Sequence, residues 1–261
     1  MASPDFSATP DFSSQVERCF SRGAAAYTQQ ARLQAAVAAR LGQLSGRLAR
    51  ALPAGPRADL GAGSGLLSRA IEAQIGGPAL LRLDSCRALL AEGARLDPEP
   101  APQRHWDLNA GLPAELQGAA LLASSFALQW LEHPGQQLQH WCSALQPGGV
   151  LLLAVPCAGS FGLWREAAQA AAVPFTGLAL PAAEPLVAAT TSLKLLRCEQ
   201  LRFSRPNHGA RAFLQEIKAI GAQASRGRRL SPAELRRLIA HWPGPEQAIV
   251  WEVLVLMGVK R

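Results

Sequence analysis

Residues 59–65 read DLGAGSG, an aspartate followed by glycine at every second position. Glycine at this density weakens the interior of a helix or a strand, so it indicates a turn. The stretch begins at the end of the short segment RAD (57–59) and precedes LLSRAIEAQI (66–75), which has the apolar spacing of a helix. We therefore predict a strand, a glycine turn and a helix, in which bare main chain lets a ligand approach closely.

The spacing of these glycines excludes the dinucleotide fingerprint, because Leu66 occupies the place where G-x-G-x-x-G needs a glycine or alanine. The pattern is instead D-x-G-x-G-x-G, which resembles the motif of class I S-adenosylmethionine-dependent methyltransferases. The resemblance implies that Asp59, Gly61, Gly63 and Gly65 surround the amino-acid end and the ribose of that cofactor. The alternative is a tight strand-to-helix turn that holds no ligand.

Strands and helices alternate along the rest of the first half of the chain, which predicts a parallel sheet. Two helices are expected within 12–50. Strands are then expected at 79–84, 104–108, 119–125 and 150–156, and helices at 66–75, 85–96 and 134–145. Beyond Pro156 we expect a helix at 163–172, a loop at 174–185, a strand at 192–204, two helices within 208–241 and a last strand at 248–261. This is one α/β domain with helical additions.

The composition is that of a folded chain without a membrane span, since 49% of the 261 residues are apolar but no apolar run is long enough. Residues 1–11 read as a disordered lead-in and lack the features of a signal peptide. Five scattered cysteines without a C-x-x-C pair argue against a disulfide framework and a metal site, and favour a reducing cytoplasm. The net charge of +7 suggests an acidic partner, or simply a basic soluble surface.

Two further acids follow predicted strands. Asp84 ends the second strand, 19 residues after Gly65, where a carboxylate can accept hydrogen bonds from both hydroxyls of a ribose. The alternative is a cap for the following helix, and both roles can coexist. Asp107 follows the third strand, where it either accepts from the amino group of adenine or caps a turn.

Several stretches together resemble one family, the malonyl-acyl-carrier-protein O-methyltransferases of biotin synthesis. The resemblance covers nearly the whole chain. It rests on FSRGAAAYTQQARLQ (20–34), DLGAGSG (59–65), LD (83–84), SSFALQW (124–130), PGGVLLLAVPCAGSFGLW (147–164), IKAIGA (217–222) and LSPAELRRL (230–238).

This resemblance implies a Rossmann-like α/β fold, with a mostly parallel seven-stranded sheet whose last strand is antiparallel. Residues 12–261 would form a single domain. Within it, a helical lid would span 12–52, a cofactor-binding core 57–156, and the substrate side 157–261. The implied reaction transfers a methyl group from S-adenosyl-L-methionine to the free carboxylate of malonyl on an acyl carrier protein.

The resemblance also implies roles for single residues. Tyr27 and Gln34 would lie on the lid, Tyr27 toward the acceptor and Gln34 toward the cofactor, and Ser124 would border the cofactor. The alternative for Tyr27 is an aromatic side chain packed in the core. Candidate cations for the acceptor carboxylate are Arg165, Arg211 and Lys218, and the alternative for each is a solvated surface charge. An ionised carboxylate needs no general base, and His105, His133, His140, His208 and His241 lie in no paired motif.

An arginine-rich run could bind an acidic carrier protein electrostatically: Arg226, Arg228, Arg229, Arg236 and Arg237. It could also be a solvated surface. Three other functions remain open, namely methylation of a small free acid such as trans-aconitate, methylation of RNA, and cofactor binding without turnover. The RNA function lacks the stacking aromatics of a nucleic-acid groove, and the sequence contains no N/D-P-P-Y/F motif of base methylation.

Overall fold

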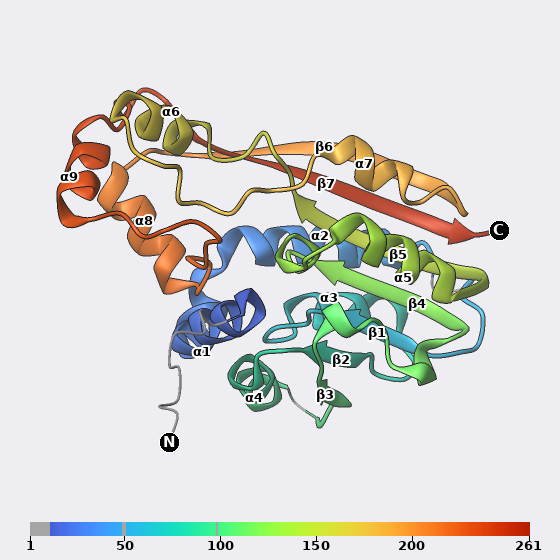
Figure 1. Ribbon diagram of the computed structural model, residues 1–261. Coiled ribbons are helices and arrows are strands. Elements are labelled where there is room, and N and C mark those ends of the chain that lie inside the picture. Colours follow the sequence, from blue (N-terminus) through green and yellow to red (C-terminus); the bar gives the residue numbers. More distant parts are fainter. Residues whose placement is uncertain (1–10, 49–50, 98) are drawn as a thin grey trace, which may run out of the picture.

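The computed structural model describes residues 11–48, 51–97 and 99–261. They form a seven-stranded sheet in the order β3-β2-β1-β4-β5-β7-β6 (Figure 1). The strands are β1 (Arg57–Leu60), β2 (Leu81–Asp84), β3 (Gln103–His105), β4 (Ala119–Ser125), β5 (Leu145–Pro156), β6 (Leu193–Arg205) and β7 (Ile249–Lys260). Only β7 runs against its neighbours, which confirms the expected sheet. The predicted lead-in lies outside the described residues, except for Asp11.

The helices follow the expected rhythm, with one correction. They are α1 (Phe12–Gln30), α2 (Arg32–Gly46), α3 (Leu66–Ile75), α4 (Arg87–Leu96), α5 (Pro134–Ala144), α6 (Gly162–Ala170), α7 (Ala183–Ala188), α8 (Ala210–Ala219) and α9 (Pro232–Ala240). The prediction of a loop through 174–185 is wrong at its end, because α7 begins at Ala183. Pro185 lies in the first turn of α7, where proline is tolerated, and buried Leu186 anchors the helix on the sheet.

Alternate residues of the strands pack on the two faces of the sheet, as the pleat requires. Leu121 and Ala123 of β4 face the core formed with α2 and α3, whereas Leu122 faces the core formed with α5 and α7. Each face is thus covered by helices, and the carboxyl ends of the parallel strands remain as the edge where loops can form a site.

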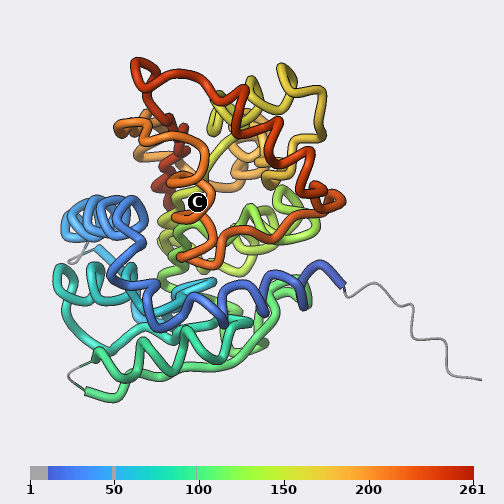
Figure 2. Tube along the Cα trace, turned by 90° about the vertical axis from the view of Figure 1, so that its left-hand side faces the viewer, coloured from blue at the N-terminus to red at the C-terminus, as the bar shows by residue number. Residues whose placement is uncertain are grey.

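Helix α1 lies between two parts of the chain that are distant in sequence. It packs on α4 on one side and on α8 on the other, and Figures 1 and 2 show it between the sheet layer and the C-terminal helices. Helices α6, α8 and α9 share a separate core around Trp164 and Phe213. No described helix is both long enough and apolar enough to cross a membrane.

We expect the contact between α2 and α3 to be intolerant of a single methyl group. A Cβ on Gly42 would lie 2.5 Å from the Ala70 carbonyl oxygen, whereas one on Gly46 of the same helix would meet only the flexible Gln74 side chain at 3.2 Å. Overpacking costs about 1–3 kcal/mol, against roughly 1 kcal/mol by which alanine favours a helix. In urea unfolding, Gly42→Ala should lower the free energy of unfolding by about 1–2 kcal/mol, and Gly46→Ala should not. Equal stability of the two variants would contradict this packing.

Candidate functional site

The glycine turn after β1 is tied to the end of β2. The main-chain N–H groups of Gly61 and Ala62 donate to the Leu83 carbonyl oxygen at 2.8 and 2.9 Å. The next N–H group in the turn, that of Gly63, donates to Asp84 Oδ2 at 2.7 Å. The turn is therefore fixed on the carboxylate that the sequence singled out.

Two of the glycines leave room on opposite sides of this turn. Gly61 has a φ of 73°, and a Cβ there would lie 2.2 Å from the Ala127 side chain. Gly63 has a φ of 55°, and its missing side chain would meet only Leu89 and Tyr27, at 3.8 and 3.9 Å. Gly61 thus lets the loop after β4 approach, while Gly63 leaves space for a ligand.

The third glycine has a different role from the one expected. Gly65 has a φ of 80° and caps the N-terminus of α3, and a Cβ there would lie 2.9 Å from the Arg82 guanidinium. It is not among the residues that line the cavities described below. Gly65 therefore shapes the turn and the helix start.

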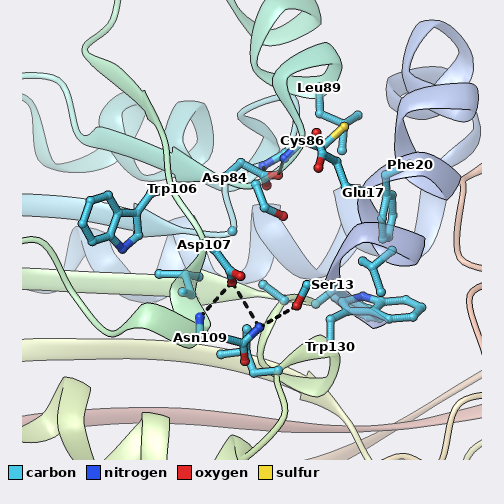
Figure 3. A pocket seen from close by; sticks show the side chains of 18 of the residues that line it. Ser13, Glu17, Phe20, Asp84, Cys86, Leu89, Trp106, Asp107, Asn109 and Trp130 are labelled. Carbon is cyan, nitrogen blue, oxygen red and sulfur yellow. Dashed lines mark hydrogen bonds between the residues drawn. The ribbon is translucent and has the colours of Figure 1, made fainter. Parts of the chain in front are cut away.

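Asp84 and Asp107 each bond to the main chain two residues on, and both also line a cavity. Asp84 Oδ1 accepts from the N–H group of Cys86 at 2.7 Å, and Cys86 rather than Asp84 is the N-cap residue of α4. Asp107 Oδ1 accepts from the main chain and the side-chain amide of Asn109, at 2.9 and 3.1 Å (Figure 3). Each of the two carboxylates keeps acceptor capacity for a ligand.

Three cavities adjoin at this edge of the sheet. The loop cavity lies beside the glycine turn, between α1 and the ends of β1 to β4, and has about 690 Å³ of empty space, its opening to solvent included. The aromatic cavity lies between α1, α6, α8 and β7 and has about 610 Å³, its opening included. The small cavity lies beside Asp59. Tyr27 lines all three cavities and Gln34 lines the aromatic and small cavities, so both predicted lid residues lie at the site.

The charged side chains that line the cavities are all acidic among the described residues. Glu17, Asp84 and Asp107 line the loop cavity, Asp59 lines the small cavity, and the aromatic cavity is lined by uncharged residues. The predicted carboxylate-binding cations lie elsewhere. Arg211 and Lys218 are exposed, and the Arg165 guanidinium stacks on the Phe175 ring at 4.2 Å.

Asp59 is a buried acid whose hydrogen bonding is incomplete. It is 1% exposed, and its Oδ2 accepts from the Ser68 hydroxyl at 2.6 Å. Its Oδ1 is buried without a partner among the described residues. Burial raises the pKa of Asp59 to about 7, against the smaller opposing effects of the Ser68 hydrogen bond and the Arg82 charge.

The serine that faces the site is not the one expected. Ser124 is buried and donates to the Leu60 carbonyl oxygen at 2.7 Å, which joins β4 to β1. Ser125 lines the loop and small cavities, and its buried hydroxyl has no partner among the described residues. None of the five histidines lines the three cavities.

Sequence reasoning missed most of the apolar lining. Trp106 and Leu108 flank Asp107 at the loop cavity, and Phe20 and Phe126 line both the loop and the aromatic cavities. These residues lie within stretches that were singled out for other reasons. A loop that carries an acid at a strand end also brings the neighbours of that acid to the same edge, which is the signal that could have found Trp106 and Leu108.

We expect Asp59 to make the stability of the chain depend on pH. Its folded pKa of about 7 exceeds the ordinary value of 3.8, so the folded chain binds the proton more tightly than the unfolded chain. The stabilisation that this proton gives the folded chain is complete below pH 3.8 and is lost as the pH rises to about 7. The free energy of unfolding falls over this range by up to about 1.4 kcal/mol per pH unit. Urea unfolding of Asp59→Asn should lack this part of the dependence. Parallel curves for the variant and the wild type would refute it.

Two curated proteins are similar to the chain in sequence. It is 33% identical over 195 residues to the biotin biosynthesis bifunctional protein BioCD of Bordetella avium, covering 73% of this chain and 41% of that protein. It is 38% identical over 148 residues to the malonyl-acyl-carrier-protein O-methyltransferase of Alcanivorax borkumensis, covering 56% and 49%. The match thus spans less than half of either relative. No protein-family model matches the chain.

Solved structures share the fold. The YcgJ protein of Bacillus subtilis superposes with a TM-score of 0.57 at 13% identity, over 85% of this chain and 98% of its own. A Bacillus halodurans protein assigned as a methyltransferase superposes with a TM-score of 0.58 at 13% identity, over the same shares of the two chains. An S-adenosylmethionine-dependent methyltransferase of Thermotoga maritima gives a TM-score of 0.51 at 12% identity, over 94% of this chain and 100% of its own. The chain is therefore related in sequence to a bifunctional protein of biotin biosynthesis and to a malonyl-acyl-carrier-protein O-methyltransferase, and it has the Rossmann-like fold of the class I methyltransferases.

Proposed function

We propose that the chain transfers a methyl group from S-adenosylmethionine to the free carboxylate of a malonyl group on an acyl carrier protein. The observation that carries the proposal is a cavity lined by acids, without a cation among the described residues, beside a glycine turn. S-adenosylmethionine has a sulfonium, an ammonium and one carboxylate, and so a net positive charge. Acids that converge on such a ligand attract it through a medium of lowered dielectric constant.

The residues at the site fit this cofactor. Asp84 would accept from the ribose hydroxyls with the lone pairs that its two main-chain bonds leave free. Asp107 would accept from the adenine amino group with Oδ2, which its bonds to Asn109 do not occupy. Asp59, whose Oδ1 is buried without a partner, would accept from the ammonium group, with Gln34 beside it.

The aromatic cavity favours an acceptor with a single negative charge. Phe126, Phe161, Trp164 and Trp251 are among its lining residues. A tricarboxylate such as trans-aconitate would bury several charges there without a cation to pair them, which is costly. An uncharged acyl chain that ends in one carboxylate buries only one charge, and esterification removes that charge. The acid lining likewise disfavours a nucleic acid at the site.

The chain's own groups orient the acceptor and exclude water. The bound cofactor supplies an electrophilic methyl group. The acceptor carboxylate is already ionised at neutral pH, so the site needs no general base. Burial, with smaller effects from Asp84 and Asp59, raises the pKa of Tyr27. Its phenol therefore stays protonated and can donate a hydrogen bond to the acceptor carboxylate.

A basic surface beside the cavities would bind the acidic carrier. Arg18 and Arg22 of α1 are exposed. Burial raises the pKa of the Cys19 thiol, and the charges of Arg22, Arg229 and Arg18 partly oppose this rise. Arg228 is occupied by Glu234 through two hydrogen bonds, so we assign it no role in docking. Phe20, on the same helix, lines both large cavities. An acyl arm could therefore reach inward from this surface.

The five free cysteines support the cytoplasm as the compartment.

We expect Asp84→Asn to weaken cofactor binding. The amide keeps the size of the side chain but removes its charge and one acceptor. Loss of charge-assisted hydrogen bonds to the ribose should raise the calorimetric dissociation constant of S-adenosylmethionine by about 10- to 100-fold. Glu115→Gln, an exposed acid that pairs with Arg104 away from the cavities, is the matched control. Equal affinity of Asp84→Asn and the control would exclude Asp84 from the cofactor site.

We expect methyl-labelled S-adenosylmethionine to transfer label to malonyl carrier protein, in a base-labile form, because the product is an ester. Acetyl carrier protein, whose acyl group has no free carboxylate, is the matched acceptor and should remain unlabelled. Label on free trans-aconitate alone, or on RNA alone, would overturn the proposal in favour of those substrates. Tight cofactor binding without transfer to any of them would indicate a regulator.

A further inference from the structure

Two phenylalanines at the site have an unfavourable backbone conformation. Among the described residues, the non-glycine residues with left-handed φ are Phe126 at 57°, Phe161 at 64° and Ala172 at 50°. Phe126 and Phe161 both line the aromatic cavity, whereas Ala172 is exposed and lines none of the three. Bulky residues rarely adopt this conformation, and where they do it is often at a functional site.

The strained peptide of Phe126 is held from both sides. Its N–H group donates to the Ala154 carbonyl oxygen of β5 at 2.9 Å. Its carbonyl oxygen accepts from Gln129 Nε2 at 2.7 Å, and Gln129 is only 6% exposed. A strained conformation persists where its surroundings fix it in this way.

Phe126, with its strained backbone, lies where the loop cavity and the aromatic cavity meet. Phe126 is one of the side chains that line both the loop cavity and the aromatic cavity, whereas Phe161 lines the aromatic cavity alone. The residue after Phe126 is Ala127, which Gly61 of the glycine turn closely approaches. The segment 126–127 therefore contacts the turn on one side and the aromatic cavity on the other.

We propose that the Phe126 ring aligns the methyl acceptor with the cofactor, and that Gln129 is a positioning residue that acts through it. The inference rests on the proposed function. In the transfer, a carboxylate oxygen forms the new C–O bond while the C–S bond breaks and its electron pair stays on sulfur. This displacement needs the oxygen in line with the breaking bond, and such alignment accounts for much of the rate in bound reactions.

Two variants of Phe126 test the proposal. The first removes the ring and keeps the backbone strain, and the second removes both the ring and the strain. Phe126→Ala keeps the left-handed penalty, whereas Phe126→Gly relieves it. Both variants should lose at least about 10-fold in kcat for malonyl carrier protein. Their dissociation constants for S-adenosylhomocysteine should stay within about 3-fold of the wild type, because the assigned cofactor contacts are unchanged. The Tm of Phe126→Gly should equal or exceed that of Phe126→Ala, which separates transfer from stability.

Two control variants change the other two non-glycine residues with left-handed φ among the described residues. Ala172→Gly should leave kcat, KM and cofactor affinity at wild-type values. Phe161→Leu should change KM for the carrier more than kcat, since Phe161 lines only the acceptor side.

Gln129→Met, which keeps the size of the side chain but lacks the hydrogen-bond donor, should lower kcat. Combined with Phe126→Gly it should cause no further loss, because both act through one ring.

The outcomes separate the inference from the function on which it rests. Wild-type kcat in Phe126→Ala and Phe126→Gly, with an active wild type, would overturn the inference and leave the methyltransferase standing. A loss of transfer matched by an equal loss of cofactor affinity would also overturn it, because the ring would then serve cofactor binding. Absence of transfer by the wild type would overturn the proposed function itself, and the inference with it.

Discussion

The hydrogen bond from the Gly63 N–H group to Asp84 joins the two features on which the site depends. It holds the glycine turn after β1 against the end of β2, so that bare main chain and a carboxylate face the same cavity. The bond requires a left-handed φ at Gly63 and a parallel pairing that places β2 beside β1. The loop after β4 can then approach Gly61, and it brings Ser125 and Phe126 to the same edge.

The charges of the chain are separated between its interior and its surface. The net charge is +7, yet the described cavity residues that carry charge are acids. An acidic site attracts a cationic cofactor, and a basic exterior attracts an acidic carrier. In the proposed function, the acceptor would then enter an uncharged cavity, where its single carboxylate would be esterified. This arrangement relates the overall composition to both proposed ligands.

Much of the fold and part of the site could be predicted from sequence because they depend on local pattern. The glycine spacing predicted the turn. The positions of Asp84 and Asp107 at the ends of predicted strands placed both acids at the same edge of the sheet. The cations were misplaced because charge alone does not say which way a side chain faces. On α8, Phe213 and Ile217 are buried and Arg211 and Lys218 are exposed, a helical periodicity that could have placed both cations outside. The strain at Phe126 depends on contacts with β5 and Gln129, which no residue type reveals.

The central claim is that the glycine turn and Asp84 hold a sulfonium nucleoside rather than a dinucleotide. Calorimetric titration of the wild type and of Gly63→Val with S-adenosylmethionine, and of the wild type with NAD, tests this most directly. We expect one nucleoside bound per wild-type chain, no binding of NAD, and loss of nucleoside binding in the variant, whose side chain would enter the cavity. Absence of nucleoside binding, or equal binding by Gly63→Val, would contradict it.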